Sequence, residues 1–383
     1  MQHKVLFISS WYPTNENKTH GIFVRRYAEA IALKNNVAVI HVSGSETFED
    51  KLKIESRTEK GVYEVYVYFK KKNANAFTKF SNYKKHYLEG LEYLLKHWGK
   101  PDILQVNVFF PAAIAGMMIA KKLNIPYIVS EHWTGYDPAD GSYKGIIKKY
   151  FSEKAAKTAK RIVVVSKDLK QKMLKHGLKG EYETIPNVVD TGVFRYKAKP
   201  SSPSFRFIHI SSLEPAQKNV EGLIRVFKEL KTANPLAELI IIGDSVYKDE
   251  LERQSGSLLN NSVFFRGQKF GTELVAEIQA ADCLVMFSNY ENLPVVMLEA
   301  MCCGLPVIST DVGGIKEWVG NGEGILVTPG DEKELLNAVK KIIIEKEKYN
   351  HETISRHACK NFNYGHIASL FTNVYDEVLK AKN

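Results

Sequence analysis

Short runs of apolar residues alternate with segments of helical periodicity along nearly the whole chain, and the alternation starts again after residue 205. Short continuous apolar runs are typical of parallel strands that are covered on both faces. Repeated strand–helix–strand units favour doubly wound parallel sheets. A length of 383 residues is sufficient for two domains of this kind. We therefore predict an α/β protein built from two Rossmann-like domains in tandem.

The predicted elements fall into two series. In the first series we expect strands over 5–9, 37–42, 103–108, 127–130 and 161–165, and helices over 22–34, 112–123, 143–159 and 167–176. In the second series we expect strands over 205–210, 239–242, 263–265, 283–287 and 307–309, and helices near 220–231, 272–280, 295–302 and 331–346. The stretch 197–204, rich in Lys, Pro and Ser, reads as an interdomain linker. The domains are accordingly set at 1–196 and 204–360, and an apolar helical stripe over 364–380 could pack on either one.

Several protein classes are excluded by the same sequence. No apolar run reaches the ~18–20 residues that span a bilayer, and the first apolar run is too short for a signal peptide, so we expect a cytoplasmic protein. The four cysteines have neither disulfide nor zinc spacing, and no metal site is predicted. A dinucleotide oxidoreductase is disfavoured because no G-x-G-x-x-G follows the first strand.

The charge is distributed unevenly between the two halves. Residues 1–200 contain 34 Lys and Arg against 19 Asp and Glu, whereas residues 201–383 contain 19 against 24. The basic half should favour anionic partners such as pyrophosphate, an acidic glycan or a phospholipid surface. Nucleic acid is disfavoured because no recognised binding module is present.

The most informative stretch runs from Ser288 to Ile308. It begins where an apolar strand ends, which is where doubly wound folds bind ligands. Pro294 suits the first helical position, and the amides of Val295 and Val296 would then face an anion. Glu291 precedes this helix and Glu299 lies on it, so that two carboxylates could accept hydrogen bonds from sugar or ribose hydroxyls. The pattern predicts a site for a ligand that carries both phosphate and hydroxyl groups.

At this point the sequence resembles the retaining glycosyltransferases of family 4, which have the GT-B fold of two Rossmann-like domains facing across a cleft. The resemblance extends over nearly the whole chain. Its further motifs are Ile185-Pro186-Asn187-Val188-Val189-Asp190, Ile241-Ile242-Gly243-Asp244, Val312-Gly313-Gly314 and Gly324-Ile325-Leu326-Val327. It implies that 204–360 binds a nucleotide-diphosphate sugar, that 1–196 binds the acceptor, and that the final helix, 364–383, packs back on the N-terminal domain.

The resemblance also implies roles for residues of the C-terminal half. Glu291 would bind donor-sugar hydroxyls and Glu299 the ribose, with Asn292 and Leu293 beside the sugar and Val295 and Val296 beside the phosphates. Lys218 falls where the family places a diphosphate-binding lysine, and a cation there would neutralise charge on the departing diphosphate. Ser212 stands where the family often has an arginine, so one phosphate contact is lost or is replaced by another cation such as Arg266. Arg266 and Gly267 would line the base pocket.

Two residues of the N-terminal half complete the implied site. Gly21 occupies one position of the Gly-Gly pair usual in the family, with His20 in the other, so the match is partial. His132 ends a predicted strand, and the resemblance makes it a donor-sugar contact near the reacting carbon, with Glu131 placed to orient or charge it. We thus expect His132, Lys218 and Glu291 to take part in the reaction.

The expected reaction is transfer of a sugar with retention of anomeric configuration, without metal or cofactor, to a glycan or lipid-linked acceptor in cell-surface polysaccharide synthesis. No candidate nucleophile is evident, and for this family the usual proposal is front-face attack in which the leaving phosphate takes the acceptor proton. A nucleotide-sugar 2-epimerase of the same architecture and a non-enzymatic two-lobed binding protein remain as alternatives.

The basic N-terminal half also raises the question of a membrane surface. Lysines and aromatic residues alternate between residues 69 and 87, including Phe69, Lys70, Lys71, Lys72, Phe77, Phe80, Tyr83, Lys84, Lys85 and Tyr87. This segment could touch anionic lipid, which would make the protein peripheral on the inner face of the membrane, or it could be a solvated face. Further basic residues are Lys148, Lys149, Lys154, Lys157, Lys160 and Arg161.

Overall fold

The computed structural model describes residues 2–17, 19–45, 48, 50–70, 76–200 and 202–381, without the side chains of 76–80. The chain divides into two compact units. Unit 1 comprises Met1–Tyr136, Gly141–Val188 and Tyr364–Asn383, and unit 2 comprises Asp137–Asp140 and Val189–Asn363. The boundary between the units therefore lies at 188/189, before the segment 197–204.

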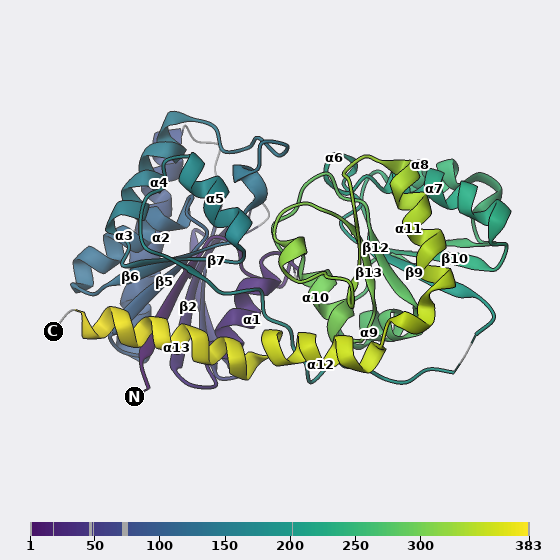
Figure 1. The fold of residues 1–383 in the computed structure, drawn as a ribbon. Coiled ribbons are helices and arrows are strands. Elements are labelled where there is room, and N and C mark those ends of the chain that lie inside the picture. Colours follow the sequence, from purple (N-terminus) through teal and green to yellow (C-terminus); the bar gives the residue numbers. More distant parts are fainter. Residues whose placement is uncertain are drawn as a thin grey trace. The chain divides into compact units, whose positions relative to one another are not determined.

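Unit 1 is a mixed α/β unit (Figure 1). Its strands are β1 (Lys4–Ser9), β2 (Asn36–Ser45), β3 (Leu52–Glu59), β4 (Val62–Lys70), β5 (Ile103–Asn107), β6 (Tyr127–Glu131), β7 (Arg161–Val164) and β8 (Tyr182–Thr184). Its helices are α1 (Ile22–Ile31), α2 (Ala76–His97), α3 (Ala112–Leu123), α4 (Ile146–Thr158), α5 (Lys167–Lys175) and α13 (Tyr364–Lys380). The strand order within the described residues is β3-β4-β2-β1-β5-β6-β7-β8.

The edge of this sheet differs from the prediction. Strands β3 and β4 pair in antiparallel register, joined by a tight turn at Lys60–Gly61, so the sheet is not wholly parallel. Of the two strands of this hairpin, neither of which the sequence analysis predicted, β3 carries a charged or polar residue at most positions and therefore lacks the apolar run of a buried strand. An edge strand has solvent on one side and tolerates such a composition.

Unit 2 is a six-stranded parallel sheet within the described residues, in the order β11-β10-β9-β12-β13-β14. Its strands are β9 (Phe205–Ile210), β10 (Ala237–Ile242), β11 (Val263–Phe265), β12 (Cys283–Met286), β13 (Val307–Thr310) and β14 (Gly324–Val327). Its helices are α6 (Pro215–Lys218), α7 (Val220–Ala233), α8 (Lys248–Ser255), α9 (Gly271–Ala280), α10 (Val295–Cys302), α11 (Glu332–Ile344) and α12 (His351–Phe362). The order is that of a doubly wound dinucleotide-type fold, which reverses between β9 and β12.

Helix α13 belongs to the core of unit 1. The helix runs close to α1 in Figure 1, and its apolar stripe shares one hydrophobic cluster with α1 and the first two strands. Phe371 and Tyr375 are fully buried there beside Tyr27, and the Phe371 and Tyr27 ring centroids lie 5.3 Å apart. The apolar stripe of α13 is therefore part of the hydrophobic core of unit 1.

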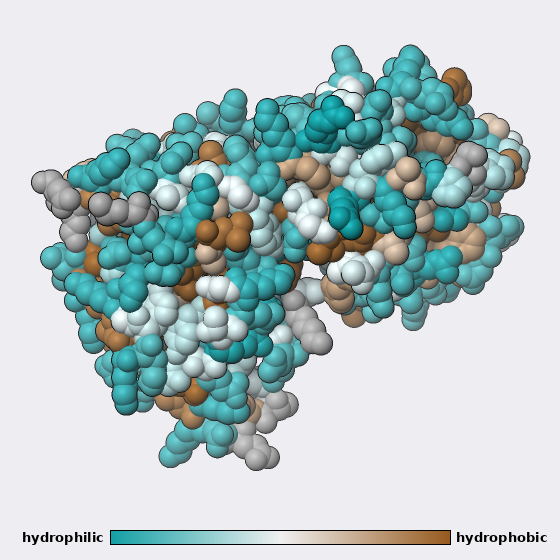
Figure 2. Space-filling view, turned by 90° about the horizontal axis from the view of Figure 1, so that it is seen from below, coloured by the Kyte–Doolittle hydropathy of each residue, from teal (hydrophilic) through white to brown (hydrophobic). Residues whose placement is uncertain are grey.

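The surface is mainly hydrophilic where Figure 2 displays it. On the face drawn there, hydrophobic residues lie in small groups among hydrophilic ones. Small scattered groups of this kind are normal on the surface of a folded domain. None of the helices that the structure describes is long and apolar enough to cross a membrane.

Candidate functional site

A largely buried ion pair lies at the point where the strand order of unit 2 reverses. Lys218 ends α6, which follows β9, and Glu291 follows β12, the neighbouring strand. The Lys218 Nζ atom lies 2.5 Å from Glu291 Oε1, with 14% and 6% of the two side chains exposed. Ligands of doubly wound sheets bind outside the carboxyl ends of the strands at such a reversal. The fold thus places the two motifs where a ligand is expected.

Two residues that the sequence analysis did not select hold this pair in position. Ser288 Oγ donates a hydrogen bond to Glu291 Oε1 at 3.0 Å, and Gln217 Nε2 lies 3.5 Å from Glu291 Oε2. The backbone N–H of Asn289 donates to the carbonyl of Gln217 at 2.7 Å, which ties the two loops together. Gln217 directly precedes Lys218, and Ser288 lies three residues before Glu291. The residue types alone do not predict these contacts.

The motif at Val312–Gly314 supports the loop that carries Glu291. The N–H of Gly314 donates to the carbonyl of Asn292 at 2.7 Å. Gly313 has a φ of +59°, and a Cβ atom there would lie 2.3 Å from the carbonyl oxygen of Glu291. Only glycine allows this approach. The glycine pair therefore fixes the backbone at Glu291 and Asn292.

Helix α10 begins directly after these residues. Pro294 is its N-cap, with φ −64° and ψ 123°, one residue earlier than the sequence analysis placed it. Val295 and Val296 are the first two residues of the helix, so their N–H groups have no acceptor within it. Asn292, Leu293 and Glu299 are all buried, with Glu299 only 2% exposed. The helix start, two carboxylates and the Lys218 ammonium are thus gathered in unit 2.

The other selected residues of unit 2 lie along the same edge of the sheet. Ser212 is exposed in the loop after β9. Arg266 follows β11, and its guanidinium lies over the Phe264 ring at 5.2 Å from the centroid. The carbonyl of Gly267 accepts a hydrogen bond from the N–H of Gly243 at 3.0 Å, joining the ends of β11 and β10. These three residues share the edge with the ion pair, but they belong to different loops.

In unit 1 the ring of His132 packs on helix α1. Its centroid lies 4.6 Å from that of Phe23 and 5.3 Å from that of Tyr27. Burial lowers the pKa of His132 to about 3, against the opposing effect of a side-chain hydrogen bond with Asn187. His132 is therefore neutral at physiological pH, so it can exchange hydrogen bonds but carries no charge.

Glu131 holds the backbone of His132 rather than charging its ring. Its Oε1 accepts hydrogen bonds from the N–H groups of His132 and Trp133 at 2.8 and 2.9 Å. Its Oε2 accepts from the Phe109 N–H at 2.9 Å and from the Tyr136 hydroxyl at 3.1 Å. Burial raises the pKa of Glu131, and these hydrogen bonds oppose the shift. Of the two roles expected for Glu131, the contacts support orientation.

Gly21 begins helix α1, on which His132 packs. It has a φ of +69°, and a Cβ atom would lie 2.3 Å from the carbonyl carbon of Trp11. The close approach explains why glycine occurs here although His20 replaces the other glycine of the pair. The Trp11 ring in turn meets Phe23 edge-on at 6.2 Å. Trp11, Phe23 and Asn187 are the neighbours that sequence reasoning did not select.

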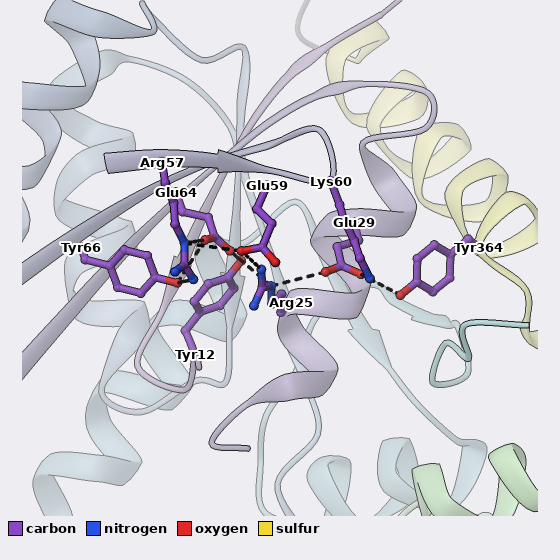
Figure 3. A network of polar contacts seen from close by, with 9 residues as sticks. All are labelled: Tyr12, Arg25, Glu29, Arg57, Glu59, Lys60, Glu64, Tyr66 and Tyr364. Atoms are coloured by element: carbon purple, nitrogen blue, oxygen red, sulfur yellow. Dashed lines mark hydrogen bonds and ion pairs between the residues drawn. The ribbon is translucent and has the colours of Figure 1, made fainter. Parts of the chain in front are cut away.

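A network of charged and hydroxyl groups anchors α1 to the edge hairpin (Figure 3). Glu64 is only 1% exposed and accepts hydrogen bonds from the Tyr12 hydroxyl and from Arg57 Nε, each at 2.6 Å. Its carboxylate also lies 3.4 Å from Arg25 Nε. Arg25 also pairs with Glu59. Glu29 extends the network by accepting hydrogen bonds from Lys60 and Tyr364. Helix α1, and with it the surroundings of His132, is thereby fixed to β3, β4 and the start of α13.

Two family models match adjoining stretches of this sequence. The model described as Glycosyltransferase Family 4 matches residues 21–193, and the model described as Glycosyl transferases group 1 matches residues 194–358. The chain belongs to the family 4, group 1 glycosyltransferases.

The individual proteins to which this chain is similar share only a low sequence identity with it. The sulfoquinovosyl transferase SQD2 of Arabidopsis thaliana is 26% identical over 268 residues, which cover 65% of this chain but only 51% of SQD2. Sucrose-phosphate synthase from Thermosynechococcus elongatus has a TM-score of 0.79 at 19% identity and covers 100% of both chains. Anabaena HepE in complex with UDP and glucose has a TM-score of 0.73 at 19% identity, covering 98% of this chain and 100% of HepE. The structural likenesses show the fold alone.

The predicted fold class is confirmed: this glycosyltransferase has two Rossmann-like α/β domains of the GT-B type. Within the described residues no group of three or more His, Cys, Asp or Glu side chains is placed to hold a metal ion. All four cysteines are free thiols.

The structure leaves the interpretation of residues 69–87 as either a lipid-facing or a solvated segment as a prediction, and shows how its aromatic rings pack where they are described. Tyr87 is fully buried, Tyr83 packs on it with centroids 4.8 Å apart, and Phe69 stacks on His86 at 4.5 Å. The Tyr87 ring is therefore part of the core, a burial that sequence alone does not reveal. Lys71, Lys72 and the side chains of Phe77 and Phe80 lie outside the described residues.

Proposed function

We propose that this protein transfers a sugar from a nucleotide-diphosphate sugar to an acceptor, with unit 2 as the donor-binding unit. The observation that carries the proposal is the Lys218–Glu291 pair at the strand reversal, directly before the start of α10. A cation, helix amides and buried carboxylates together suit a ligand that joins a diphosphate to a sugar.

Each group has a chemical task in this proposal. Lys218 and the first-turn amides of Val295 and Val296 neutralise charge on the departing diphosphate. Glu291 accepts hydrogen bonds from donor-sugar hydroxyls, beside the backbone of Asn292 and Leu293. Glu299 accepts from the ribose.

The remaining predicted contacts are part of the same proposal. Arg266 and Gly267 line the pocket for the nucleotide base. Ser212 supplies a hydroxyl where a guanidinium is usual in the family. Gly21 gives its backbone to the diphosphate or acceptor, and neutral His132 contacts the donor sugar.

We further propose that transfer retains the anomeric configuration and needs no metal ion. Lys218 and the α10 amides supply positive charge that a divalent cation would otherwise provide. With no assigned protein nucleophile, the leaving phosphate takes the acceptor proton on the face from which it departs. The acceptor is a glycan or lipid-linked saccharide in polysaccharide synthesis. Chelator-resistant activity and an unchanged anomeric configuration of the product, assigned by NMR, are the expected results.

Thermal unfolding with UDP, GDP, ADP and TDP tests the donor site without knowledge of the acceptor. One nucleotide should raise the melting temperature by several degrees, since a ligand at about 100 times its Kd adds ~2.7 kcal/mol. The rise should shrink in Glu299→Gln, which preserves the shape of a buried side chain. Glu273→Gln, an exposed change at the start of α9, serves as the matched control. If none of the four nucleotides stabilises the wild type, the donor assignment fails.

A second measurement separates transferase from epimerase. The stabilising nucleotide, supplied as its sugar conjugates with para-nitrophenyl glycosides as acceptors, should yield a new glycoside and free nucleotide diphosphate. An epimerase would instead convert the nucleotide sugar to an isomer in the absence of any acceptor. The family assignment favours the transferase over this alternative and over a two-lobed binding protein.

A further inference from the structure

The start of helix α4, residues 146–150 and called its first turn below, exposes three large hydrophobic side chains. Ile146 is 88% exposed, Ile147 65% and Tyr150 58%. Among the described residues of unit 1, the other exposed large hydrophobic side chains are Leu33 and Leu174, which are separate in sequence. Scattered exposed hydrophobic residues need no explanation, but three within five positions mark an interaction surface.

The other face of α4 packs against unit 1, which leaves this turn exposed. The opposite face of α4 buries Ser152, Ala155 and Ala156, and the helix packs on α3. Tyr143, just before α4, is buried with its ring 4.7 Å from Tyr136. Because small residues fix one face of α4 to the domain, the isoleucines and Tyr150 remain on the other face.

The segment is also strongly basic. Residues 141–160 contain six lysines and one acidic residue, Glu153. Five of these lysines are exposed: Lys144, Lys149, Lys154, Lys157 and Lys160. The sixth, Lys148, lies 4.4 Å from the centre of the Trp133 ring and donates to the Ser142 carbonyl. Lysines thus flank the apolar turn along the exposed face of α4.

We propose that the first turn of α4 docks this protein on an anionic lipid bilayer. Ile146, Ile147 and Tyr150 enter the interface between headgroups and acyl chains, and the neighbouring lysines contact lipid phosphates. Aliphatic side chains with an interfacial tyrosine and a basic surround are the composition of membrane-surface helices. Lysine is depleted from protein–protein interfaces, which argues against a protein partner. The lipid-facing surface then lies on α4 and not on residues 69–87.

Co-sedimentation of the full chain with sucrose-loaded vesicles tests this surface, with no donor or acceptor present. Vesicles of phosphatidylcholine mixed with phosphatidylglycerol should bind the wild type, and pure phosphatidylcholine should bind it much less. Added salt should weaken binding. The double variant Ile146→Ser/Ile147→Ser should lower the partition coefficient by about tenfold or more. Lys149→Gln/Lys154→Gln should lower it on the anionic vesicles only.

Matched controls and the opposing outcomes complete the design. Leu33→Ser removes a side chain that is 62% exposed in the same unit and should bind vesicles like the wild type. Unchanged melting temperatures would show that the variants fold. Vesicle binding that survives loss of both isoleucines overturns the proposal. So does light scattering that finds a wild-type dimer and a monomeric double variant, which would identify a self-association surface. Because vesicle binding is measured without donor, failure here leaves the nucleotide stabilisation test unaffected.

Discussion

The ammonium group of Lys218 lies 2.5 Å from the Glu291 carboxylate, and both side chains are largely buried. The two residues are 73 positions apart and meet because β9 and β12 are neighbours in the sheet. Each group is desolvated and relies on the other, so that a change in one alters the setting of both.

Replacing Lys218 should therefore affect both stability and activity. Lys218→Met leaves the Glu291 carboxylate buried without its cation and should destabilise unit 2 by about 2–4 kcal/mol. If Lys218 also neutralises the leaving diphosphate, kcat should fall by about 100-fold or more. Thermal unfolding and a transfer assay measure the two effects.

A second variant separates the two effects of Lys218. The double variant Lys218→Met/Glu291→Gln removes the uncompensated charge and should regain most of the stability but not the activity. A double variant with wild-type kcat would refute the proposed role of Lys218.

Buried histidines should make the protein unstable in mild acid. Burial lowers the pKa of His132 to about 3 and that of His41 and His209 to about 4. Between about pH 6.5 and 4 the unfolded chain binds protons at these positions and the folded chain does not, so stability falls as pH falls. Each fully titrating histidine contributes about 1.4 kcal/mol per pH unit. The raised pKa of Glu131 acts in the opposite direction in unit 1.

The pH dependence is measured as melting temperature between pH 7.5 and about pH 4.5, above the native pKa values. His209→Gln should reduce the fall in the melting temperature of unit 2 as the pH is lowered. His357→Gln, a change of a histidine in the same unit whose side chain is 46% exposed, should not. An equal slope in His209→Gln and wild type would contradict the buried neutral state of His209.

Glu64 should be the most sensitive acidic residue of the network in Figure 3. Glu64→Gln replaces an acceptor of two tyrosine and two arginine contacts and leaves positive charge uncompensated beside Tyr12. The expected loss is about 3 kcal/mol, or roughly 6–12 °C in melting temperature for a unit of this size. Glu55→Gln changes a 41% exposed carboxylate on the same hairpin and should cost less than about 0.5 kcal/mol.

Cys359 should be the first thiol to react. Hydrogen bonds with Cys302 and Ser355 lower the pKa of Cys359 to about 7, whereas burial raises the pKa of Cys303 to about 12 and that of Cys283 further still. Alkylation by iodoacetamide requires the thiolate, so its rate at Cys359 should rise most steeply around pH 7. Mass spectrometry identifies the site, and Cys359→Ser should abolish native labelling. Equal labelling of all four cysteines in the folded protein would refute the assignment.

Much of unit 2 could be predicted because each of its features is local. Apolar runs mark the strands, and Pro294 and the glycines mark the turns on which Glu291, Glu299 and the α10 start depend. Lys218 could be placed only through the family resemblance, since a lone lysine in sequence is usually solvated. Its partnership with Glu291 required the sheet order.

The sequence by itself determined the two Rossmann-like domains and the residue types at the candidate site, since hydrophobic periodicity and turn chemistry are properties of neighbouring residues. The tertiary structure alone decided which distant groups meet. It buried Tyr87 beneath Tyr83, made His132 neutral by packing it on Phe23 and Tyr27, and left Ile146 and Ile147 uncovered. Burial and desolvation depend on contacts between elements far apart in the chain, and these contacts exist only after the sheets have formed.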